Sequence, residues 1–294
     1  MNIQEILQRD SRQLQAALDL DTSSARIEAQ CLLQAILKVN RAYLLTHPER
    51  LLSTDETANY HALFERRMQG EPIAYILGKR EFYGHNFKVT PATLIPRPDT
   101  ELLIELALQQ IPSPPAPLPQ AGEGGRKAGR GFRVLDLGTG NGAIAISIAH
   151  ARPDIEVVAV DASEAALDVA KYNAQQLNVH NVRLLHSDWF AALSGERFDI
   201  IVSNPPYIET DDMHLSRMSF EPISALVSGV DGLDDIRRIS NEAKGHLNNG
   251  GWLMLEQGYN QAEKVRKLLL QSGFSEISSV RDLSGIERVT MGRA

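Results

Sequence analysis

The sequence predicts an α/β protein with a doubly wound, mostly parallel sheet, preceded by a small all-helical domain and a β-hairpin linker. Three observations support this prediction. From residue 132 onward, short apolar runs alternate with helix-like segments, which is typical of a parallel sheet covered by helices on both faces. Residues 1–75 carry apolar side chains at helical spacing. Residues 76–95 combine short apolar runs with a turn-prone stretch.

The composition is that of an ordinary globular protein. Of 294 residues, 43% are hydrophobic and 23% are charged, and the net charge is −7. This acidic balance argues against a protein that binds nucleic acid or a membrane through a basic surface. Met1–Asp10 is amphipathic and charged, unlike a signal peptide, and no apolar run is long enough to span a bilayer. We therefore expect a cytoplasmic protein, and we expect it to be a monomer.

Cysteine and histidine usage narrows the chemistry further. Cys31 is the only cysteine, which excludes a disulfide within the chain, and it falls on the apolar face of a helical pattern, where we expect it in the core. The eight histidines show no pairing at the spacing of metal ligands. We expect no metal site.

Residues 1–75 are predicted to form a helical bundle with its own core. Ser53 and Glu56 match a capping box, which opens a helix that ends near Gly70 and Pro72. Such a bundle could recognise a substrate protein or serve as a scaffold, and the sequence barely separates these functions. Two apolar stripes recur at helical spacing, one formed by Ile3, Ile6, Leu7, Leu14 and Leu18 and the other by Ile27, Cys31, Leu32, Ala35 and Ile36.

Two segments of the chain are rich in turn-forming residues: one follows the helical domain and the other interrupts the main domain. Residues 76–95 are predicted to form a β-hairpin linker with its turn at Gly84–Asn86. Residues 112–131 are rich in proline, glycine and alanine and lack apolar periodicity, so we expect a disordered insertion within the main domain, which spans residues 96–294.

The main domain opens with a polar stretch ahead of a helix over Leu102–Gln109. Asp99 or Thr100 is expected to cap this helix, and Arg97 or Glu101 could reach a cleft. Further strands are expected at 133–137, 156–160, 182–185, 198–202 and 252–256, and helices at 142–150, 163–177, 234–247 and 261–271, with an antiparallel pair near 280–291 at the end.

A rigid polar corner follows the apolar run at 198–202. Asn204, Pro205, Pro206 and Tyr207 come directly after this predicted strand, and the prolines stop it and keep the chain extended. The Asn204 side chain and the Pro205 carbonyl offer two acceptors, which match the two N–H donors of a planar –NH₂ group, and Tyr207 offers a flat face. Such a corner could hold an amide or aromatic amine nitrogen for attack on an electrophilic carbon. The same residues could also form an ordinary turn.

A glycine-rich segment, Asp136–Gly142, lies between the first predicted strand and its helix. Glycine allows the backbone to approach a ligand closely. Asp161 ends the second strand, where a carboxylate can accept hydrogen bonds from ribose hydroxyl groups. Because Gly138, Gly140 and Ala143 also satisfy a loose dinucleotide pattern, a nicotinamide-dependent enzyme stays an alternative.

The third predicted strand contributes a further candidate pair. Asp188 could bond an adenine amino group and Trp189 could pack on the ring, although a capping aspartate with a half-buried tryptophan is nearly as good an interpretation. If the first strand and the 198–202 strand are neighbours where strand order reverses, the glycine loop and Asn204 face one cleft. S-adenosylmethionine, with an adenosine end and a reactive methyl sulfonium, would suit that cleft.

Taken together, these residues resemble class I S-adenosylmethionine-dependent methyltransferases, which have a seven-stranded sheet. More closely, the chain resembles the HemK/PrmC family of protein-glutamine N5-methyltransferases. The resemblance covers the helical domain, the hairpin, 95–101, 136–142, Asp161, 187–190, 204–207 and 220–222. The 112–131 insertion departs from the family by its length.

The resemblance implies an activity and a set of site residues. The family transfers a methyl group to the glutamine of the Gly-Gly-Gln motif in class-1 peptide chain release factors, which supports translation termination. The residues that the resemblance implies for binding of the target glutamine are Asn204, Pro205, Pro206 and Tyr207. Those implied for the cofactor are Gly138, Thr139, Gly140, Asn141, Gly142, Asp161, Trp189 and Asn204.

Two alternatives stay open. The corner at Asn204 also occurs in methyltransferases that act on exocyclic amines such as N6 of adenine, but such an enzyme needs a basic, aromatic-bearing surface and a way to extrude the base. A cofactor-binding module without catalytic activity is the third possibility, and a labelled-methyl assay separates it from the other two.

Overall fold

The computed structural model describes residues 1–113 and 131–294, so the insertion predicted at 112–131 lies almost entirely outside the described residues. The chain forms two compact units, Met1–Lys79 and Arg80–Ala294. Within the described ranges, no helix has the length and apolar character that crossing a membrane requires.

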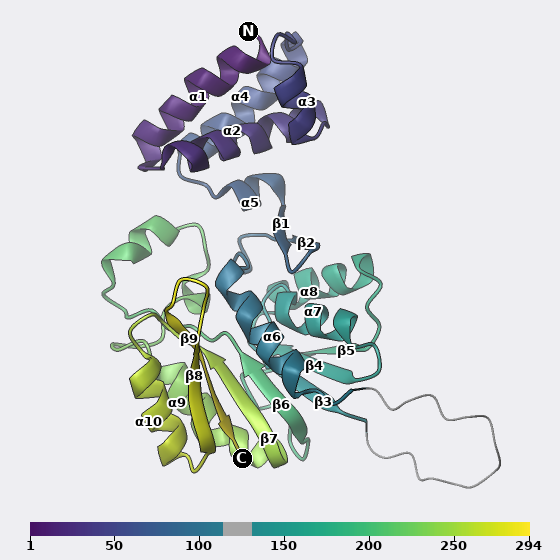
Figure 1. The fold of residues 1–294 in the computed structure, drawn as a ribbon, viewed down its shortest axis with the longest axis vertical. Helices are drawn as coiled ribbons and strands as arrows, with labels where there is room; N and C mark the ends of the chain where they lie inside the picture. The colour runs from purple at the N-terminus through teal and green to yellow at the C-terminus, as the bar shows by residue number, and fades with distance from the viewer. Residues whose placement is uncertain (114–130) are drawn as a thin grey trace, which may run out of the picture. The chain divides into compact units, whose positions relative to one another are not determined.

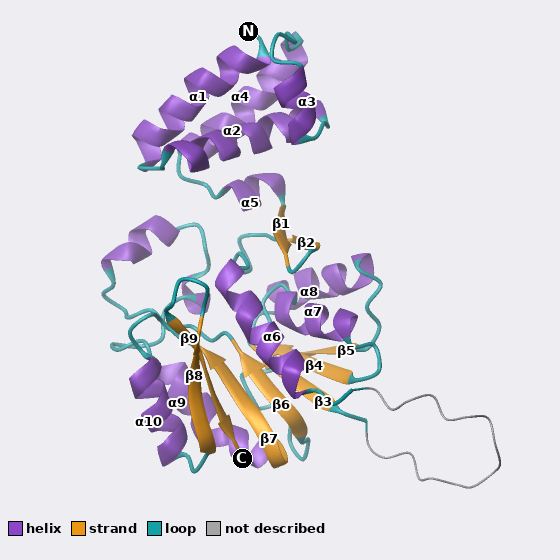
Figure 2. Ribbon diagram, in the orientation of Figure 1, coloured by secondary structure: helices purple, strands orange, loops and turns teal. Residues whose placement is uncertain are grey.

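The first unit is built from helices, as the apolar periodicity predicts (Figure 2). Asn2 and Ser53 each form a capping box with a glutamate three residues later, so backbone N–H groups at the starts of α1 and α4 find acceptors. The stripe predicted on the first helix is buried, apart from half-buried Leu18. The helices are α1 (Ile3–Leu18), α2 (Thr22–Leu37), α3 (Arg41–Thr46), α4 (Thr54–Met68) and α5 (Ile73–Leu77).

The stripe predicted on the second helix is only partly right: Leu32 is buried and Ile36 packs against the core, as predicted, but the other members are not buried. α2 buries Ala25, Ala29 and Leu32, whereas Ile27 is 49% exposed and Cys31 is only half-buried. α2 packs against both α1 and α4. The buried face of α2 combines alanines with Leu32 and Leu33, and this face, which packs on its neighbours, is rotated away from Ile27.

The hairpin forms, but its turn lies one residue earlier than predicted. β1 (Lys79–Phe82) and β2 (His85–Lys88) are joined by two residues, Tyr83 and Gly84, with φ of 48° and 75°. Two residues with positive φ form the turn whose twist matches that of paired strands. Phe82 and Phe87 are buried in a core cluster of the second unit, so the hairpin packs on that unit.

The second unit is a seven-stranded sheet between two layers of helices (Figure 1). The strand order is β5-β4-β3-β6-β7-β9-β8, with only β9 antiparallel to its two neighbours, which confirms both the doubly wound sheet and the antiparallel end. The strands are β3 (Arg133–Leu137), β4 (Glu156–Asp161), β5 (Val182–His186), β6 (Phe198–Ser203), β7 (Leu247–Glu256), β8 (Ser275–Arg281) and β9 (Glu287–Arg293). The helices are α6 (Glu101–Gln110), α7 (Ala143–Ala151), α8 (Glu164–Gln176), α9 (Asp234–Ala243) and α10 (Ala262–Gln271).

The boundary after α9 differs from the prediction. The helix expected to reach Leu247 ends at Ala243, and β7 begins at Leu247 instead of Trp252. The early part of β7 contains Asn248-Asn249-Gly250, a turn-like sequence, and the register of β6 with β7 shifts there. Residues 248–251 fall between two pairs of the register, Phe198 with Leu247 and Ile200 with Trp252, and Gly250 has φ of 75°, so β7 is irregular where the sequence has turn character.

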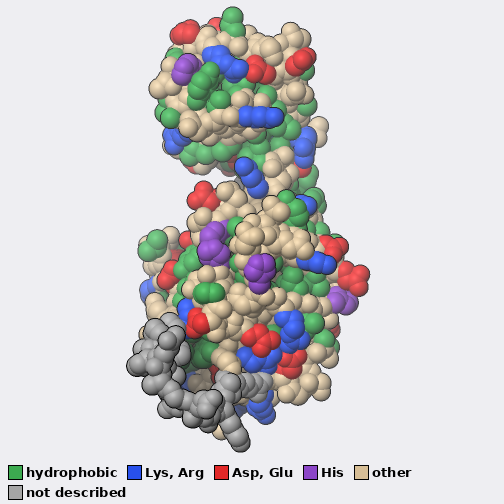
Figure 3. All heavy atoms as spheres, turned by 90° about the vertical axis from the view of Figure 1, so that its right-hand side faces the viewer, with side chains coloured by type: hydrophobic (Ala, Val, Ile, Leu, Met, Phe, Trp, Pro, Cys, Tyr) green, Lys and Arg blue, Asp and Glu red, His purple; other side chains and the backbone are tan. Residues whose placement is uncertain are grey.

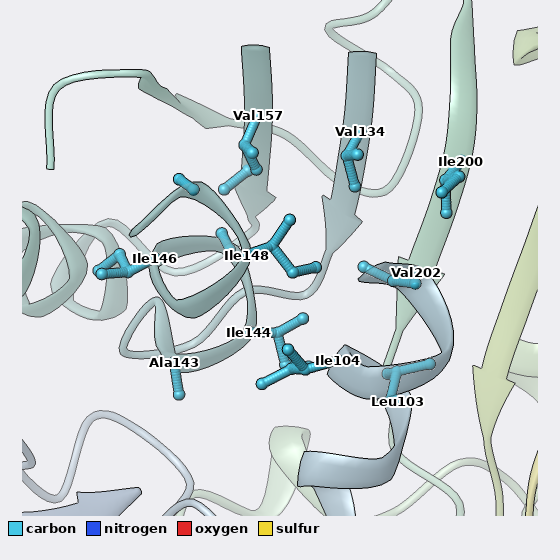
Figure 4. Close-up of a cluster of buried hydrophobic side chains, with 14 of the residues drawn as sticks. Leu103, Ile104, Val134, Ala143, Ile144, Ile146, Ile148, Val157, Ile200 and Val202 are labelled. Atoms are coloured by element: carbon cyan, nitrogen blue, oxygen red, sulfur yellow. The ribbon is translucent and has the colours of Figure 1, made fainter. Parts of the chain in front are cut away.

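Alternate residues of each central strand face opposite helix layers. Val134 and Ile200 face α6 and α7, where Ile104 and Ile144 pack against them (Figure 4). Leu135, Leu253 and their neighbours face α9 and α10 in a second cluster. The parallel strands are apolar on both faces because both are covered.

Strand order reverses between β3 and β6. β3 pairs with β4 on one side and with β6 on the other, and Leu137 lies opposite Ser203 in the register. The Ser203 hydroxyl donates a hydrogen bond to the Leu137 carbonyl at 2.7 Å, which fixes the two strand ends side by side. The condition that the sequence left open is thus met: the glycine loop and Asn204 leave the sheet at the same edge. The amino ends of these strands lie at the opposite edge, where Arg152 donates to the Ile111 carbonyl beyond α6.

Candidate active site

A cavity of about 580 Å³ lies in the second unit at the carboxyl ends of β3, β4 and β6. This volume suits a cofactor-sized ligand. Gly142, Pro205 and Tyr207 are not among the described residues that line it. The predicted site residues that do line it are Gly138, Thr139, Gly140, Asn141, Asp161, Trp189, Asn204 and Pro206.

The loop after β3 requires glycine at two positions. Gly138 has φ of 70°, and a Cβ there would lie 3.3 Å from the indole of Trp189. Gly142 has φ of 84°, and a Cβ there would lie 2.6 Å from the Ile146 side chain of α7. Gly142 therefore permits close packing at the start of the helix, whereas Gly138 keeps the backbone open to the cavity.

Asp161 holds this loop in place. Its two carboxylate oxygens accept hydrogen bonds from the backbone N–H groups of Gly140 and Ser163, each at 2.8 Å. Each oxygen keeps a second lone pair, so ribose hydroxyl groups can still bind there. Asn141, by contrast, is buried, and its side-chain oxygen accepts from the Ala143 N–H at 3.2 Å, which stabilises the turn itself.

Asp136 is fully buried beneath the loop. Its Oδ2 accepts from the Thr139 hydroxyl at 2.6 Å and from the Ala145 N–H at 3.2 Å, while its Oδ1 has no hydrogen-bond partner within the described part of the chain. Burial raises the pKa of this carboxyl to about 7, although the two hydrogen bonds lower it. Asp136 is not among the described residues that line the cavity, so its unpaired oxygen is a polar atom buried beneath the loop.

Trp189 forms one wall of the cavity. The Ser187 hydroxyl donates to the Trp189 carbonyl at 2.8 Å and accepts from the Ala192 N–H at 3.0 Å, which fixes the turn that carries the ring. Asp188 also lines the cavity, but both of its oxygens accept from Arg238 of α9, at 2.8 and 3.0 Å. Its role toward an adenine amino group stays a prediction.

Asn204 projects from the end of β6 toward the start of α6. Its Nδ2 donates to the Thr100 hydroxyl at 3.2 Å, which leaves Oδ1 as an acceptor for the cavity. The predicted capping role is wrong, because Thr100 stands at the N-cap position without a side-chain capping bond. The helix instead continues from the 3₁₀ turn η1 (Pro98–Thr100), so the hydroxyl is used by Asn204.

Tyr207 lies behind the corner. Its N–H donates to the Leu226 carbonyl at 3.2 Å, and its carbonyl accepts from Gln261 Nε2 at 3.0 Å. The ring packs against the second core cluster, the hydroxyl hydrogen bonds to Glu256, and burial raises the pKa of the phenol. In this position Tyr207 stabilises the corner from behind, and its stacking on a substrate amide stays a prediction.

Arg97, one of the two residues that could reach a cleft, does line the cavity. It forms an ion pair with Glu221, whose carboxylate also accepts from the Ile95 N–H at 3.1 Å. Two segments more than a hundred residues apart are thereby joined at the cavity wall. Glu101 instead accepts from the Tyr83 N–H at 2.9 Å and anchors the hairpin.

The sequence reasoning missed Glu256 and the role of Thr100. Glu256 ends β7, and its side chain is buried. Burial raises the pKa of this carboxyl to about 7, while a hydrogen bond from Thr100 and the charge of Arg288 lower it. A signal was present, because an acidic residue that directly follows the apolar run Leu253–Leu255 is out of place unless it has a partner.

The fold and this site define a methyltransferase. The methyltransferase small domain family matches residues 126–220. A solved methyltransferase from Pyrococcus furiosus shares the fold with a TM-score of 0.51 at 18% identity, over 80% of this chain and 98% of that chain.

More distant parts of the chain identify the family. The PrmC N-terminal domain matches residues 5–78. The release factor glutamine methyltransferase of Salmonella typhimurium is 46% identical over 93% of this chain and 94% of its own length. The protein of the same name from Escherichia coli is 42% identical over 100% of this chain and 99% of its own length. The chain belongs to the release factor glutamine methyltransferase family.

Proposed function

We propose that this protein transfers a methyl group from S-adenosylmethionine to the side-chain amide nitrogen, N5, of the glutamine in the Gly-Gly-Gln motif of class-1 peptide chain release factors. The observation that carries the proposal is the Asn204 carboxamide, whose N–H is bound by Thr100 while its oxygen is left for a ligand in the cavity of the glycine loop. The names of the relatives point to the same acceptor.

The residues present fit S-adenosylmethionine. The backbone at Gly138 is open toward the cavity, Asp161 keeps lone pairs for ribose hydroxyl groups, and Trp189 offers a ring face. When bound, this cofactor supplies an electrophilic methyl group on a sulfonium. Gly142 supports the loop by its packing.

Asn204, which lines the cavity, accepts one N–H of the target amide through Oδ1. The second acceptor assigned here is the carbonyl of Pro205, which follows Asn204 in the chain but is not among the described residues that line the cavity. An amide nitrogen is a poor nucleophile because its lone pair is delocalised, so two acceptors that stabilise its developing positive charge accelerate attack. Fixed orientation contributes up to roughly 7–11 kcal/mol. Pro205 and Pro206 keep the corner rigid, and Leu226 anchors it through Tyr207. No strong base is required, because the methylated nitrogen is acidic.

We assign release-factor recognition to the helical unit. Its surface exposes apolar side chains, among them Leu45 and Leu51, which are 55% and 70% exposed. If they contact the release factor, Leu45→Ser and Leu51→Ser raise KM for that protein and leave the affinity for S-adenosylmethionine unchanged. Equal KM values for the variants and the parent would contradict this assignment.

The test is incubation with labelled S-adenosylmethionine and a purified class-1 release factor, followed by peptide mass mapping. We expect the added mass of one methyl group in place of a hydrogen on the glutamine of Gly-Gly-Gln, and no label when that glutamine is replaced by glutamate. Label on another residue, or none, contradicts the proposal.

Nucleic acid serves as the comparison substrate in the same experiment. On the face drawn in Figure 3, cationic and anionic side chains are interspersed over the described residues of both units, and neither sign dominates. We therefore expect no methyl transfer to DNA or RNA oligonucleotides even at low salt, where electrostatic binding is strongest.

A further inference from the structure

Glu256 is a buried carboxyl group that the reaction proposed above does not use. It ends β7, and the register that pairs Ser203 with Leu255 places it beside Asn204. Its side chain is 1% exposed, and its Oε2 has no hydrogen-bond partner among residues 1–113 and 131–294. A buried carboxyl group with incomplete pairing destabilises a fold, so its position calls for another explanation.

Two side chains from distant parts of the chain, those of Thr100 and Asn204, connect Glu256 to the cavity. Asn204 Nδ2 donates to the Thr100 hydroxyl at 3.2 Å, and this hydroxyl hydrogen bonds to the Glu256 carboxyl. A threonine hydroxyl has one proton, so while it donates to a carboxylate it can only accept from Asn204. The carboxamide is thereby held with its nitrogen toward Thr100 and its oxygen toward the cavity.

We propose that Glu256 is a positioning residue for methyl transfer: through the Thr100 hydroxyl, it fixes the Asn204 carboxamide with its oxygen presented to the target amide. This inference rests on the proposed glutamine methylation. It assigns Glu256 no contact with the substrate, and it gives Thr100 a specific function that a threonine before a helix does not otherwise have.

The orientation depends on the ionisation of Glu256. Once protonated, Glu256 can donate to the Thr100 hydroxyl, which is then free to donate to the oxygen of Asn204. This arrangement favours the flipped carboxamide, which presents its own N–H groups to the N–H groups of the target amide. Donor then faces donor, and the acceptor that orients the nucleophile is lost.

The surroundings of Glu256 determine the pH at which it loses its proton, and this pH is near neutral. Burial, the largest effect, and the charge of Asp99 raise the pKa of Glu256 to about 7, while hydrogen bonds from Thr100 and Tyr207 and the charge of Arg288 lower it. We therefore expect turnover to rise between about pH 6 and 8. The neighbouring charges that hold this cluster are the ion pairs of Arg288 with Asp99 and Asp282, at 3.2 and 3.4 Å, and Arg97 near Tyr207.

Two substitutions at Thr100 separate positioning from packing. Thr100→Val keeps the shape but removes the hydroxyl, and Thr100→Ser keeps the hydroxyl. We expect Thr100→Val to lower kcat on the release factor by about 10- to 100-fold, as misplacement of a reacting group does, and Thr100→Ser to stay within about threefold of the parent. Affinity for S-adenosylmethionine, measured by calorimetry, stays unchanged in both.

Glu256→Gln supplies the second test. The variant is expected to have a lower kcat and no rise of activity with pH, and the double variant with Thr100→Val to lose little more than either single variant, because the residues act in one chain. Carbon-13 NMR of labelled glutamate gives a readout independent of activity: one carboxyl signal titrates near pH 7 in the parent protein and is absent in Glu256→Gln.

The outcomes distinguish this inference from the function on which it rests. If the parent protein methylates no release factor at any pH, the proposed function fails. If the parent is active and Glu256→Gln keeps its kcat and pH profile, or if Thr100→Val equals Thr100→Ser, the positioning role is refuted. Should Glu256→Gln not fold, the Thr100 pair and the NMR titration of the parent decide.

Discussion

The two ends of the cavity are built in different ways. At the cofactor end, one contiguous loop and the nearby Asp161 supply the binding groups, and backbone N–H groups form the contacts that hold the loop. At the amide end, Thr100, Asn204 and Glu256 come from three distant segments and meet through side chains that are largely withdrawn from water. The first end depends on backbone conformation, whereas the second depends on long-range packing and on the ionisation of a buried group. Substitutions should therefore affect them separately.

The largest effect is expected from a substitution that impairs only the amide end of the cavity. Asn204→Ala removes one of two acceptors for the target amide, so we expect kcat to fall by about 10²- to 10³-fold, as for loss of one group that stabilises transition-state charge. Cofactor binding stays measurable, because the glycine loop is untouched. The measurement is single-turnover methyl transfer with calorimetry on the same sample, and unchanged turnover would refute the assigned role.

The next effect concerns stability and has the opposite sign. The pKa of Glu256 is raised in the folded protein from an ordinary 4.5 to about 7, so its contribution to stability is present below pH 4.5 and is lost as pH rises through 7. Glu256→Gln removes this loss. We expect its free energy of unfolding to exceed that of the parent by up to about 3 kcal/mol at pH 8, with little gain at pH 4.5. Urea denaturation at both pH values measures this, and an equal shift at both contradicts it.

At the cofactor end, Asp161→Ala removes the acceptor for the backbone N–H of Gly140 in the loop and for that of Ser163 at the start of α8. Without it the loop must be ordered by the ligand, so we expect about tenfold weaker binding of S-adenosylmethionine, with kcat at saturation little changed. Asp154→Ala is the matched control, since Asp154 pairs with Arg152 on the surface. Equal affinity of the two variants would contradict the role of Asp161.

The smallest effect is expected from a substitution that tests the contact between Gly138 and Trp189. Gly138→Ala and Gly84→Ala both place a side chain at positive φ, 70° and 75°, but only at Gly138 does the new Cβ approach Trp189, at 3.3 Å. We expect both variants to lose about 1 kcal/mol of stability. Only Gly138→Ala should also weaken cofactor binding, by a fewfold, because the ring must shift. Identical cofactor affinities would show that Trp189 tolerates the contact.

The same contrast explains what the sequence could predict. The strands of the sheet, their alternation with helices and the position of the glycine loop depend on local patterns in the sequence. For the fold, the predictions from these patterns are confirmed by the positions and order of strands β3 to β6. The prediction of the buried face of α2 was partly wrong, because the face that packs on neighbouring helices contains Ala25 and Ala29 and leaves Ile27 exposed. Thr100 was interpreted as a cap, since no local pattern reveals that its hydroxyl meets a side chain 104 positions later. Glu256 did leave a local signal, an acidic residue after the apolar run Leu253–Leu255, but its partner Thr100 lies far away in the sequence.

The sheet also determines where this protein tolerates added length. Every group assigned here to chemistry lies beyond the carboxyl ends of β3, β4, β6 and β7, whereas Arg133 opens β3 at the opposite edge and Ile111 lies beside Arg152. Evolution or an engineer can lengthen the polypeptide at that edge, for example to carry a fluorescent reporter, because the length of the strands separates the graft from the reacting atoms.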